Sequence, residues 1–395
     1  MSLTLTARQS VVKELSKKYR RVTKKEKSKI IDNLISLTNY NRCYARYVLR
    51  NYQYVRCRSK SKRQNKKKYD EKFLKDLKKI WYIYDNICGK RLAPFMPEAV
   101  DALERHGEIE IHDGNKHKLL SVSAATIDRL LKAERKKYLL GRKGHTKPGT
   151  LLKSQIPIRT FADWNENKAG FTEMDLVGHS GGNSSGQFNY TLDLTDIKTC
   201  WTELRAVLNK ARVWTFEAIE DIRYSVPFEI KGLDSDNGGE FINEHLYQYC
   251  LKEKITFTRA RSSRKNDNCY VEQKNWSVVR RAVGYKRFDT ESSCKTLNEL
   301  YTYLNLYVNH FQPVMKLKEK IRCGNKVKKI YDTARTPYRR VLEEKSINQK
   351  EKDNMIDIHE QLNPVELKRN ITRLQKKLMK IKVITPLKIA IKKKC

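Results

Sequence analysis

The chain has 395 residues, with 83 Lys or Arg against 45 Asp or Glu, so its formal net charge is +38. This length allows two or three domains that each bury a core, and the positive excess favours a polyanion, most commonly nucleic acid, as partner. No apolar run approaches the roughly 18 residues that cross a bilayer, and the opening MSLTLTARQS lacks the features of a secretory signal. We therefore expect a soluble cytoplasmic protein and no membrane partner.

The cysteines and histidines give no sign of a zinc site. The nine cysteines are scattered and form no CxxC pair, which argues against both a disulfide framework and a four-ligand zinc site. His106, His112 and His117 lie near one another in sequence, but no cysteine pair follows to complete a ligand set. We interpret them as packing or surface residues.

The first 60 residues contain a pattern typical of a helix-turn-helix. Apolar residues at helical spacing predict a helix that ends at turn residues 38–41, and a second helix follows. This second helix would carry Tyr44, Tyr47 and Val48 on its apolar side and, on the other side, a basic stripe of Arg42, Arg46 and Arg50. Such a helix can lie against DNA as a recognition helix. A helical hairpin with a solvated basic face fits the local pattern equally, and the charge of the whole chain favours DNA.

A similar unit is predicted at 119–138. Its helix would carry Ile127, Leu130 and Leu131 on the apolar side and four basic residues on the polar side: Arg129, Lys132, Arg135 and Lys136. We thus assign 1–140 to a helical DNA-binding region with two candidate helix-turn-helix units. Segment 141–168 is rich in Gly, Pro and basic residues, and we interpret it as a basic linker that could follow a phosphate backbone. The remaining apolar positions of the helical region read as core: Phe73, Leu77, Ile80, Trp81 and Tyr84.

A new domain begins after the linker. Alternating patterns predict three strands, and then helix, strand, helix, strand and helix, which makes a mixed α/β sheet with helices on its faces. Asp175 lies inside the first apolar strand, EMDLVG, where an ionised side chain is unfavourable unless it is paired or bound to a cation. Asp234 and Asp236 end a later strand, in LDSDNGGEF.

The last helix of this domain, from about 268 to 284, carries a third acid. Glu272 recurs at helical spacing with Trp276, Val279 and Val283, so we expect its side chain on the apolar face of the helix, which packs towards the sheet. Three acids at apolar or strand-end positions of one domain, Asp175, Asp236 and Glu272, suggest divalent metal chemistry. Mg²⁺ prefers hard oxygen ligands, and a pair of ions can clamp both oxygens of a phosphoryl displacement.

The motifs EMDLVGHSGG, LDSDNGGEF and NDNCYVEQKN resemble, in this order, the catalytic core shared by DDE transposases of bacterial insertion sequences and retroviral integrases. In that family the second aspartate directly precedes Asn-Gly and the glutamate follows on a helix; here 35 residues separate Asp236 from Glu272. The resemblance covers about 165–290. It implies a ribonuclease H-like fold for 169–312, Asp175, Asp236 and Glu272 as catalytic metal ligands, and two Mg²⁺ or Mn²⁺ ions. The zinc-ligand set that retroviral integrases carry at their N-terminus is missing.

Other residues around these motifs receive lesser roles. We expect Asp234 to have a supporting or structural role, and Asn237 and Gly238 to shape the turn. Arg261, Arg264 and Lys265 suit a mobile loop that holds DNA phosphates, or equally a solvated loop. Three further aspartates are assigned to turns or helix caps: Asp193, Asp196 and Asp267.

The C-terminal region, 313–395, is basic and ends in a helix. Asn363 and Pro364 are suited to its start. Its apolar residues repeat by four and three, which would either join two subunits or pack within the chain: Leu367, Ile371, Leu374, Leu378 and Ile381.

The resemblance implies a bacterial, nucleoid-associated transposase. It would cut double-stranded DNA at the ends of an insertion sequence and transfer the 3′-hydroxyl into target DNA, as a homo-oligomer assembled on DNA. Two alternatives stay open: a metal-dependent nuclease of the same fold, and a catalytically silent DNA-binding regulator derived from a transposase.

Overall fold

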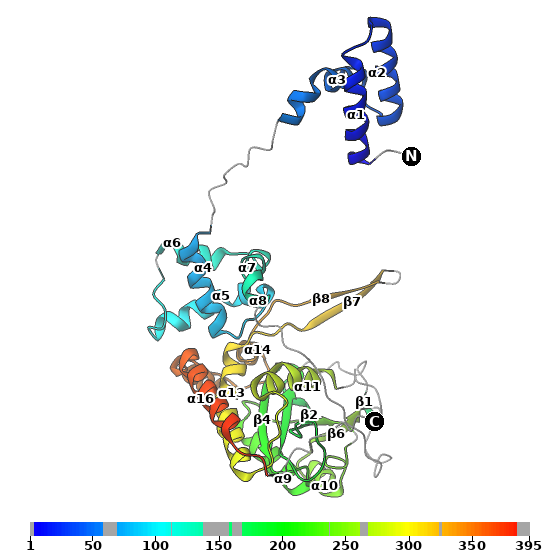
Figure 1. Cartoon of the computed structure of the whole chain (residues 1–395). Helices are drawn as coiled ribbons and strands as arrows, with labels where there is room; N and C mark the ends of the chain where they lie inside the picture. Colours follow the sequence, from blue (N-terminus) through cyan, green and yellow to red (C-terminus); the bar gives the residue numbers. More distant parts are fainter. Residues whose placement is uncertain are drawn as a thin grey trace, which may run out of the picture. The chain divides into compact units, whose positions relative to one another are not determined.

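The computed structural model describes most of the chain, namely residues 4–57, 69–111, 113–136, 158–159, 168–236, 238–260, 268–323 and 326–384. These residues form two compact units, one within 1–70 and the other within 71–395 (Figure 1). No helix in these described stretches is both long and apolar enough to span a bilayer.

The N-terminal unit is a bundle of three helices. They are α1 (Leu5–Tyr19), α2 (Lys24–Thr38) and α3 (Arg42–Cys57). The carboxylate of Glu26 accepts the N–H of Thr23 at 3.0 Å, which caps the start of α2. Helices α2 and α3 lie where the sequence predicts them, with the turn between them, whereas α1 was not anticipated.

The predicted apolar side of α3 is partly wrong. Val48 is buried in the bundle, but Tyr44 and Tyr47 are 47% and 53% exposed, because Ala45 and Leu49 fill the core positions instead. The two tyrosines therefore share the solvent-facing surface of α3.

The larger unit begins with five helices: α4 (Glu71–Ile83), α5 (Gly89–Arg105), α6 (Asp113–Ser121), α7 (Ala124–Leu130) and α8 (Lys132–Lys136). Gly89 opens α5 where a Cβ atom would lie 2.1 Å from the carbonyl oxygen of Ala124, so α5 and α7 approach closely only because this residue is glycine. The five core residues predicted for this region are confirmed as fully buried: Phe73, Leu77, Ile80, Trp81 and Tyr84.

A six-stranded mixed sheet forms the centre of the unit, in the order β1-β6-β5-β2-β3-β4. Strands β2, β3 and β4 are antiparallel neighbours, and β5, β6 and β1 continue the sheet parallel to β2. The bounds are β1 (Ile158–Arg159), β2 (Phe171–Gly178), β3 (Tyr190–Asp196), β4 (Thr202–Val207), β5 (Gly232–Ser235) and β6 (Thr256–Ala260). The predicted order of strands and helices from 169 to 284 is thus confirmed.

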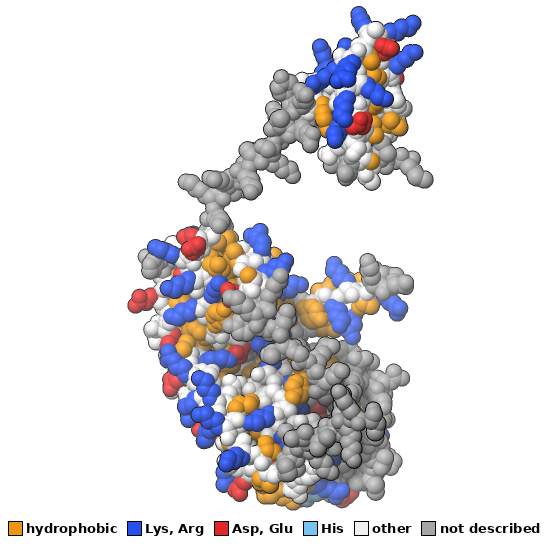
Figure 2. Space-filling view, viewed as in Figure 1, with side chains coloured by type: hydrophobic (Ala, Val, Ile, Leu, Met, Phe, Trp, Pro, Cys, Tyr) orange, Lys and Arg blue, Asp and Glu red, His pale blue; other side chains and the backbone are white. Residues whose placement is uncertain are grey.

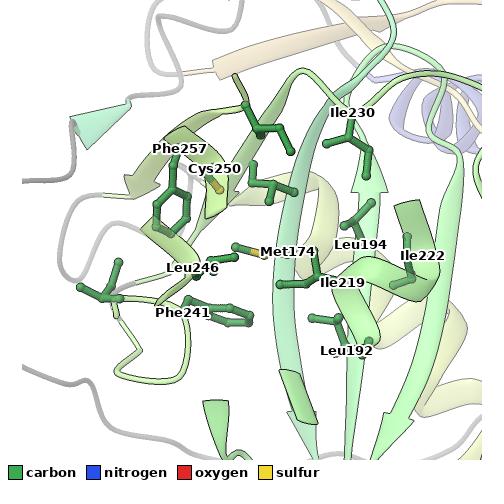
Figure 3. Close-up of a cluster of buried hydrophobic side chains, with 14 of the residues drawn as sticks. Met174, Leu192, Leu194, Ile219, Ile222, Ile230, Phe241, Leu246, Cys250 and Phe257 are labelled. Atoms are coloured by element: carbon green, nitrogen blue, oxygen red, sulfur yellow. The ribbon is translucent and has the colours of Figure 1, made fainter. Parts of the chain in front are cut away.

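Helices α9 (Arg212–Ser225) and α10 (Glu244–Lys252) cover one face of the sheet. Figure 3 shows the apolar core between them and the strands. Met174, Leu192 and Leu194 point from β2 and β3 towards Ile222 of α9 and Leu246 of α10, and all five are buried. Apolar residues alternate with polar ones along β3, which made this strand readable from sequence, and both of its faces are buried.

The opposite face is covered by a long interrupted helix and by α13 (Glu291–Phe311). The interrupted helix consists of α11 (Cys269–Lys274), a π-helical segment η2 (Asn275–Arg280) and α12 (Arg281–Val283).

The C-terminal region contains more than the predicted terminal helix. A separate antiparallel hairpin, β7 (Leu317–Cys323) and β8 (Lys326–Tyr331), precedes α14 (Pro337–Glu343), α15 (Gln349–Gln361) and α16 (Pro364–Lys380). The side-chain oxygen of Asn363 accepts the N–H of Val365 at 2.9 Å and so caps α16. Helix α16 packs along α13, and this packing within the chain buries Leu367, Ile371, Leu374 and Leu378.

Loss of core volume beneath the sheet should destabilise the larger unit. Leu194 is 1% exposed in the cluster of Figure 3, and Leu194→Ala is expected to lower the free energy of unfolding by about 2–5 kcal/mol, because it removes buried methyl groups and leaves a cavity. Val213→Ala is the control, since Val213 is 61% exposed, and should change stability by less than about 0.5 kcal/mol. Urea unfolding measures both; equal losses would contradict this packing.

Candidate active site

The face of the sheet beneath α11 is lined by acids rather than by apolar side chains. On β2, Glu173 and Asp175 point to this face, since Met174 between them points to the apolar core. In the sheet register Asp175 lies opposite Asp193 of β3, and Glu173 lies opposite Asp234 of β5. The strands thereby bring together carboxylates that are 18 positions apart in the first pair and 61 in the second.

Asp175 and Asp236 are neighbours at the point where the parallel pairing of β2 with β5 ends. Met174 pairs with Ser235, so the next residue along each strand is one of these two aspartates. Burial raises the pKa of Asp175 to about 7, and the negative charges of Asp236 and Glu272 act in the same direction. The side-chain amide of Asn275 donates to Asp175 Oδ2 at 2.7 Å. Asp236 and Glu272 therefore both act electrostatically on Asp175.

The chain after β5 turns so that the backbone orients Asp236. The N–H of Gly238 donates to Asp236 Oδ1 at 2.8 Å, and burial raises the pKa of Asp236. A Cβ atom at Gly238 would lie 2.7 Å from the carboxyl carbon of Glu240 and 2.9 Å from Asp236 Oδ1. Any larger residue at this position would therefore displace these two carboxylates. Asn237, predicted to shape the same turn, lies outside the described residues.

The predicted position of Glu272 on the buried side of its helix is wrong. Glu272 is exposed and Trp276 is 61% exposed, whereas Val279 and Val283 are fully buried. The π-helical segment η2 begins at Asn275, and its wider turn changes which residues face the sheet. A uniform helical period therefore placed the first half of the helix incorrectly. Being exposed, Glu272 lies where a bound substrate or ion can reach it.

The donor set suits a hard divalent cation. Asp175 and Asp236 offer carboxylate oxygens side by side, and Mg²⁺ is commonly bound by one or two carboxylates together with water and substrate oxygens. Asn275 Oδ1 is also buried and has no hydrogen-bond partner. Among the residues that the structure describes, no three His, Cys, Asp or Glu side chains form a preformed metal cage. The site thus resembles an open one that substrate oxygens would complete.

Two of the aspartates assigned to turns can be located. Asp196 accepts the N–H of Thr199 at 2.7 Å and that of Gly170 at 2.8 Å, as a turn residue does. Asp193 is instead fully buried in the middle of β3 and accepts the hydroxyl of Thr195 at 2.9 Å, so its assignment to a turn is wrong. Asp267 lies outside the described part of the chain.

Glu173 is a functional candidate that the sequence reasoning missed. Its Oε2 accepts the N–H of Val271 at 2.7 Å, which fastens the first turn of α11 to β2 directly beside Asp175. Burial raises the pKa of Glu173 well above its usual range, with a further contribution from the charge of Asp234. Asp234 is itself buried and accepts the hydroxyl of Thr258. The alternation that makes Glu173 face the same way as Asp175 was the available signal.

The predicted DNA-contacting arginines of α3 are on its surface. Arg46 and Arg50 are exposed on the side that also carries Tyr44 and Tyr47. Arg42 is exposed too, but its guanidinium donates to Asp32 and, at 2.8 Å, to Ser28 of α2. Arg261, Arg264 and Lys265 fall outside the residues that the structure describes.

The strand arrangement defines the class of the core. Three antiparallel strands extended by parallel strands on the side of the first, with helices on both faces, form a ribonuclease H-like fold. No protein-family model matches the chain.

Comparison with curated proteins identifies the family. The uncharacterized protein y4rM of Sinorhizobium fredii is 37% identical over 329 residues, which are 83% of this chain and 93% of y4rM. The chain belongs to the same family as y4rM.

Among solved structures, the catalytic core domain of BIV integrase aligns with 44% of this chain and 94% of its own, at 17% identity and a TM-score of 0.31. The HTLV-2 integrase catalytic core domain in complex with magnesium, in its dimeric form, aligns with 37% of this chain and 91% of its own, at 12% identity and a TM-score of 0.29.

The raised pKa of Asp175 predicts a specific pH dependence of stability. Its pKa rises from 3.8 to about 7 on folding, so between these values the folded state binds more protons and the free energy of unfolding falls as pH rises. Asp175→Asn should make this decline shallower in urea titrations from pH 4 to 8 with EDTA. Glu217→Gln, at an exposed position of the same domain, should leave the slope unchanged. Identical slopes for both variants would contradict the burial of Asp175.

Glu173 should be replaceable by glutamine but not by alanine. Burial raises the pKa of its carboxyl group well above the usual range, and Glu173→Gln retains a side-chain oxygen that can accept the N–H of Val271. Glu173→Ala leaves that buried N–H unpaired, which should cost about 1–3 kcal/mol of stability. Urea unfolding at pH 7 compares the two variants; equal destabilisation would show that the hydrogen bond is unimportant.

Proposed function

We propose that this protein is a transposase that cuts DNA at the ends of an insertion sequence and joins the freed 3′-hydroxyl to target DNA. The proposal assigns Asp175, Asp236 and Glu272 as the catalytic carboxylates. It places the protein in the bacterial cytoplasm, as a homo-oligomer that holds two DNA ends together.

One observation carries the proposal. Asp175 and Asp236 directly follow Met174 and Ser235, the last pair in the parallel register of β2 and β5. Burial, together with the negative charges of Asp236 and Glu272, raises the pKa of Asp175 to about 7. A folded protein rarely holds carboxylates together in this way without a cation, because like charges in a partly buried site repel one another. Support also comes from the ribonuclease H-like strand order and from the motif DNG after β5.

Divalent ions, Mg²⁺ or Mn²⁺, when bound by these carboxylates, would activate the attacking oxygen and stabilise the leaving oxygen of a phosphodiester. The protein side chains orient the site. Asn275 and the N–H of Gly238 fix one oxygen each of Asp175 and Asp236, and Glu173 holds the helix that carries Glu272.

The proposed reaction has two in-line displacements. In the first, a water oxygen bonds to phosphorus and the P–O3′ bond at the element end breaks, which leaves a 3′-hydroxyl. In the second, that hydroxyl oxygen bonds to a target phosphorus and the target P–O3′ bond breaks. One phosphodiester forms for each one broken in the second step, so joining needs no oxidant, reductant or nucleotide cofactor.

The N-terminal unit is suited to DNA recognition. The exposed surface of α3 combines the cations of Arg46 and Arg50 with the aromatic rings of Tyr44 and Tyr47. Arginine binds phosphate and base edges, and tyrosine donates hydrogen bonds to phosphate. We assign to this surface the binding of element ends.

The test is strand transfer with a labelled DNA that carries the sequences flanking the gene, in Mg²⁺ or EDTA. Asp175→Asn, Asp236→Asn and Glu272→Gln are each expected to lower joining at least 100-fold while binding of the DNA ends persists, because each removes one carboxylate without large change in shape. Glu229→Gln is the matched control at an exposed position of the same domain and should join at the wild-type rate.

Each other outcome selects a different function. Metal-dependent cleavage without joining would favour a nuclease of the same fold. Specific binding with neither reaction would favour a DNA-binding regulator derived from a transposase. Joining by Asp236→Asn at the normal rate would refute the catalytic assignment.

A further inference from the structure

The hairpin β7–β8 is a narrow two-stranded ribbon that forms its own sheet (Figure 1). The segment 317–331, LKEKIRCGNKVKKIY, contains six Lys or Arg and one acid, Glu319. Figure 2 shows lysine and arginine side chains on its surface. Val327 and Tyr331 are 54% and 46% exposed. Because an isolated two-stranded hairpin is at best marginally stable in water, a partner that contacts the ribbon would stabilise it.

The charge pattern of the ribbon identifies the kind of partner. In the register of the two strands Lys320 lies directly opposite Lys329, and Arg322, which faces the same way, lies opposite Val327. Two ammonium groups at opposite positions can bind one anion together, and phosphate is the anion that a strongly basic chain most commonly meets.

The same face of the ribbon borders a basic cleft next to the candidate active site. The cleft has a volume of about 580 Å³, and its lining includes Lys320, Lys329 and Tyr331 of the hairpin with Tyr270 and Gln273 of α11. Its described lining carries seven Lys or Arg side chains but one acid, Asp85. Four of these cations serve the fold as well. Lys316 donates to the carbonyl of Ile197 at 2.7 Å and Lys368 pairs with Asp85. Buried Lys274 donates to the carbonyl of Cys200 at 3.3 Å and Arg281 to that of Asp85 at 2.9 Å.

We propose that the β7–β8 hairpin binds duplex DNA, with Lys320 and Lys329 on its phosphates, and guides that DNA along the cleft to the helix that carries Glu272. The major groove of DNA is wide enough for a two-stranded ribbon, and ribbons are known to enter it. The six positive charges and the neighbouring Tyr331 fit a phosphate backbone better than any protein or apolar ligand. This inference rests on the proposed function, since it treats the bound DNA as the substrate.

The test measures binding of the full-length protein to a labelled DNA duplex in EDTA, as a function of salt. Lys320→Ala/Lys329→Ala removes two phosphate contacts, so the slope of log K against log salt should fall in magnitude by about 2, and affinity at 0.1 M salt should fall on the order of 10- to 100-fold. Lys345→Ala/Lys350→Ala is the control, because it removes two exposed lysines elsewhere. Lys320→Arg/Lys329→Arg should keep wild-type binding.

The outcomes separate this inference from the proposed function. If the hairpin variant and the control lose equal affinity, or neither loses any, the hairpin is not the binding surface. That result would leave the catalytic proposal intact, because the assay contains no metal and involves no chemistry. Failure of the wild-type protein to bind any duplex would overturn both. Circular dichroism of the hairpin variant should match wild type, because both lysines are exposed; unfolding of the variant would mean that these lysines support the fold instead.

Discussion

Carboxylates from β2, β3 and β5 share one face of the sheet, and the surrounding structure supplies hydrogen-bond donors to them. Each receives at least one neutral donor: Glu173 the N–H of Val271, Asp193 the hydroxyl of Thr195, and Asp234 that of Thr258. Asp175, held by Asn275, is the half-buried member of the set. Neutral donors reduce the free-energy cost of burying a carboxylate but do not neutralise its negative charge. Asp175 is partly exposed, so a cation attracted by this charge can reach the site there.

The contacts that stabilise the sheet also fix the positions of its acidic side chains. Glu173 fastens α11 to β2, α13 packs against β4, and α16 packs along α13. The apolar core on the opposite face, around Met174 and Leu194, holds the same strands in register. Because side chains alternate along a strand, the register that buries Met174 necessarily turns Glu173 and Asp175 the other way. The hydrophobic core therefore determines where the acids lie.

Positive charge is distributed over separate surfaces. The N-terminal bundle exposes Arg46 and Arg50, while the larger unit carries the β7–β8 hairpin and the cleft beside α11. Each surface offers cations on a small rigid element, and a DNA duplex presents phosphates over tens of ångströms. Several basic surfaces that bind one long polyanion increase affinity together, since the second contact forms at a high effective concentration.

Much of the fold could be predicted from the sequence, because it rests on local patterns. Alternation identified β2 and β3, helical spacing identified the core of α4, and Asn363 with Pro364 marked the start of α16. The β7–β8 hairpin was missed because charged residues interrupt the apolar pattern of its strands.

The sequence by itself determined the order of strands and helices, the basic character of the chain and the motif that singles out Asp236. The tertiary structure decided which acids are neighbours, since Asp193 and Glu173 join Asp175 only through strand register. It also decided which side of the helix that carries Glu272 is exposed, because the π-helical turn at η2 interrupts the period on which the prediction for Glu272 relied. Pairing and packing involve residues far apart in sequence, so no local pattern contains them.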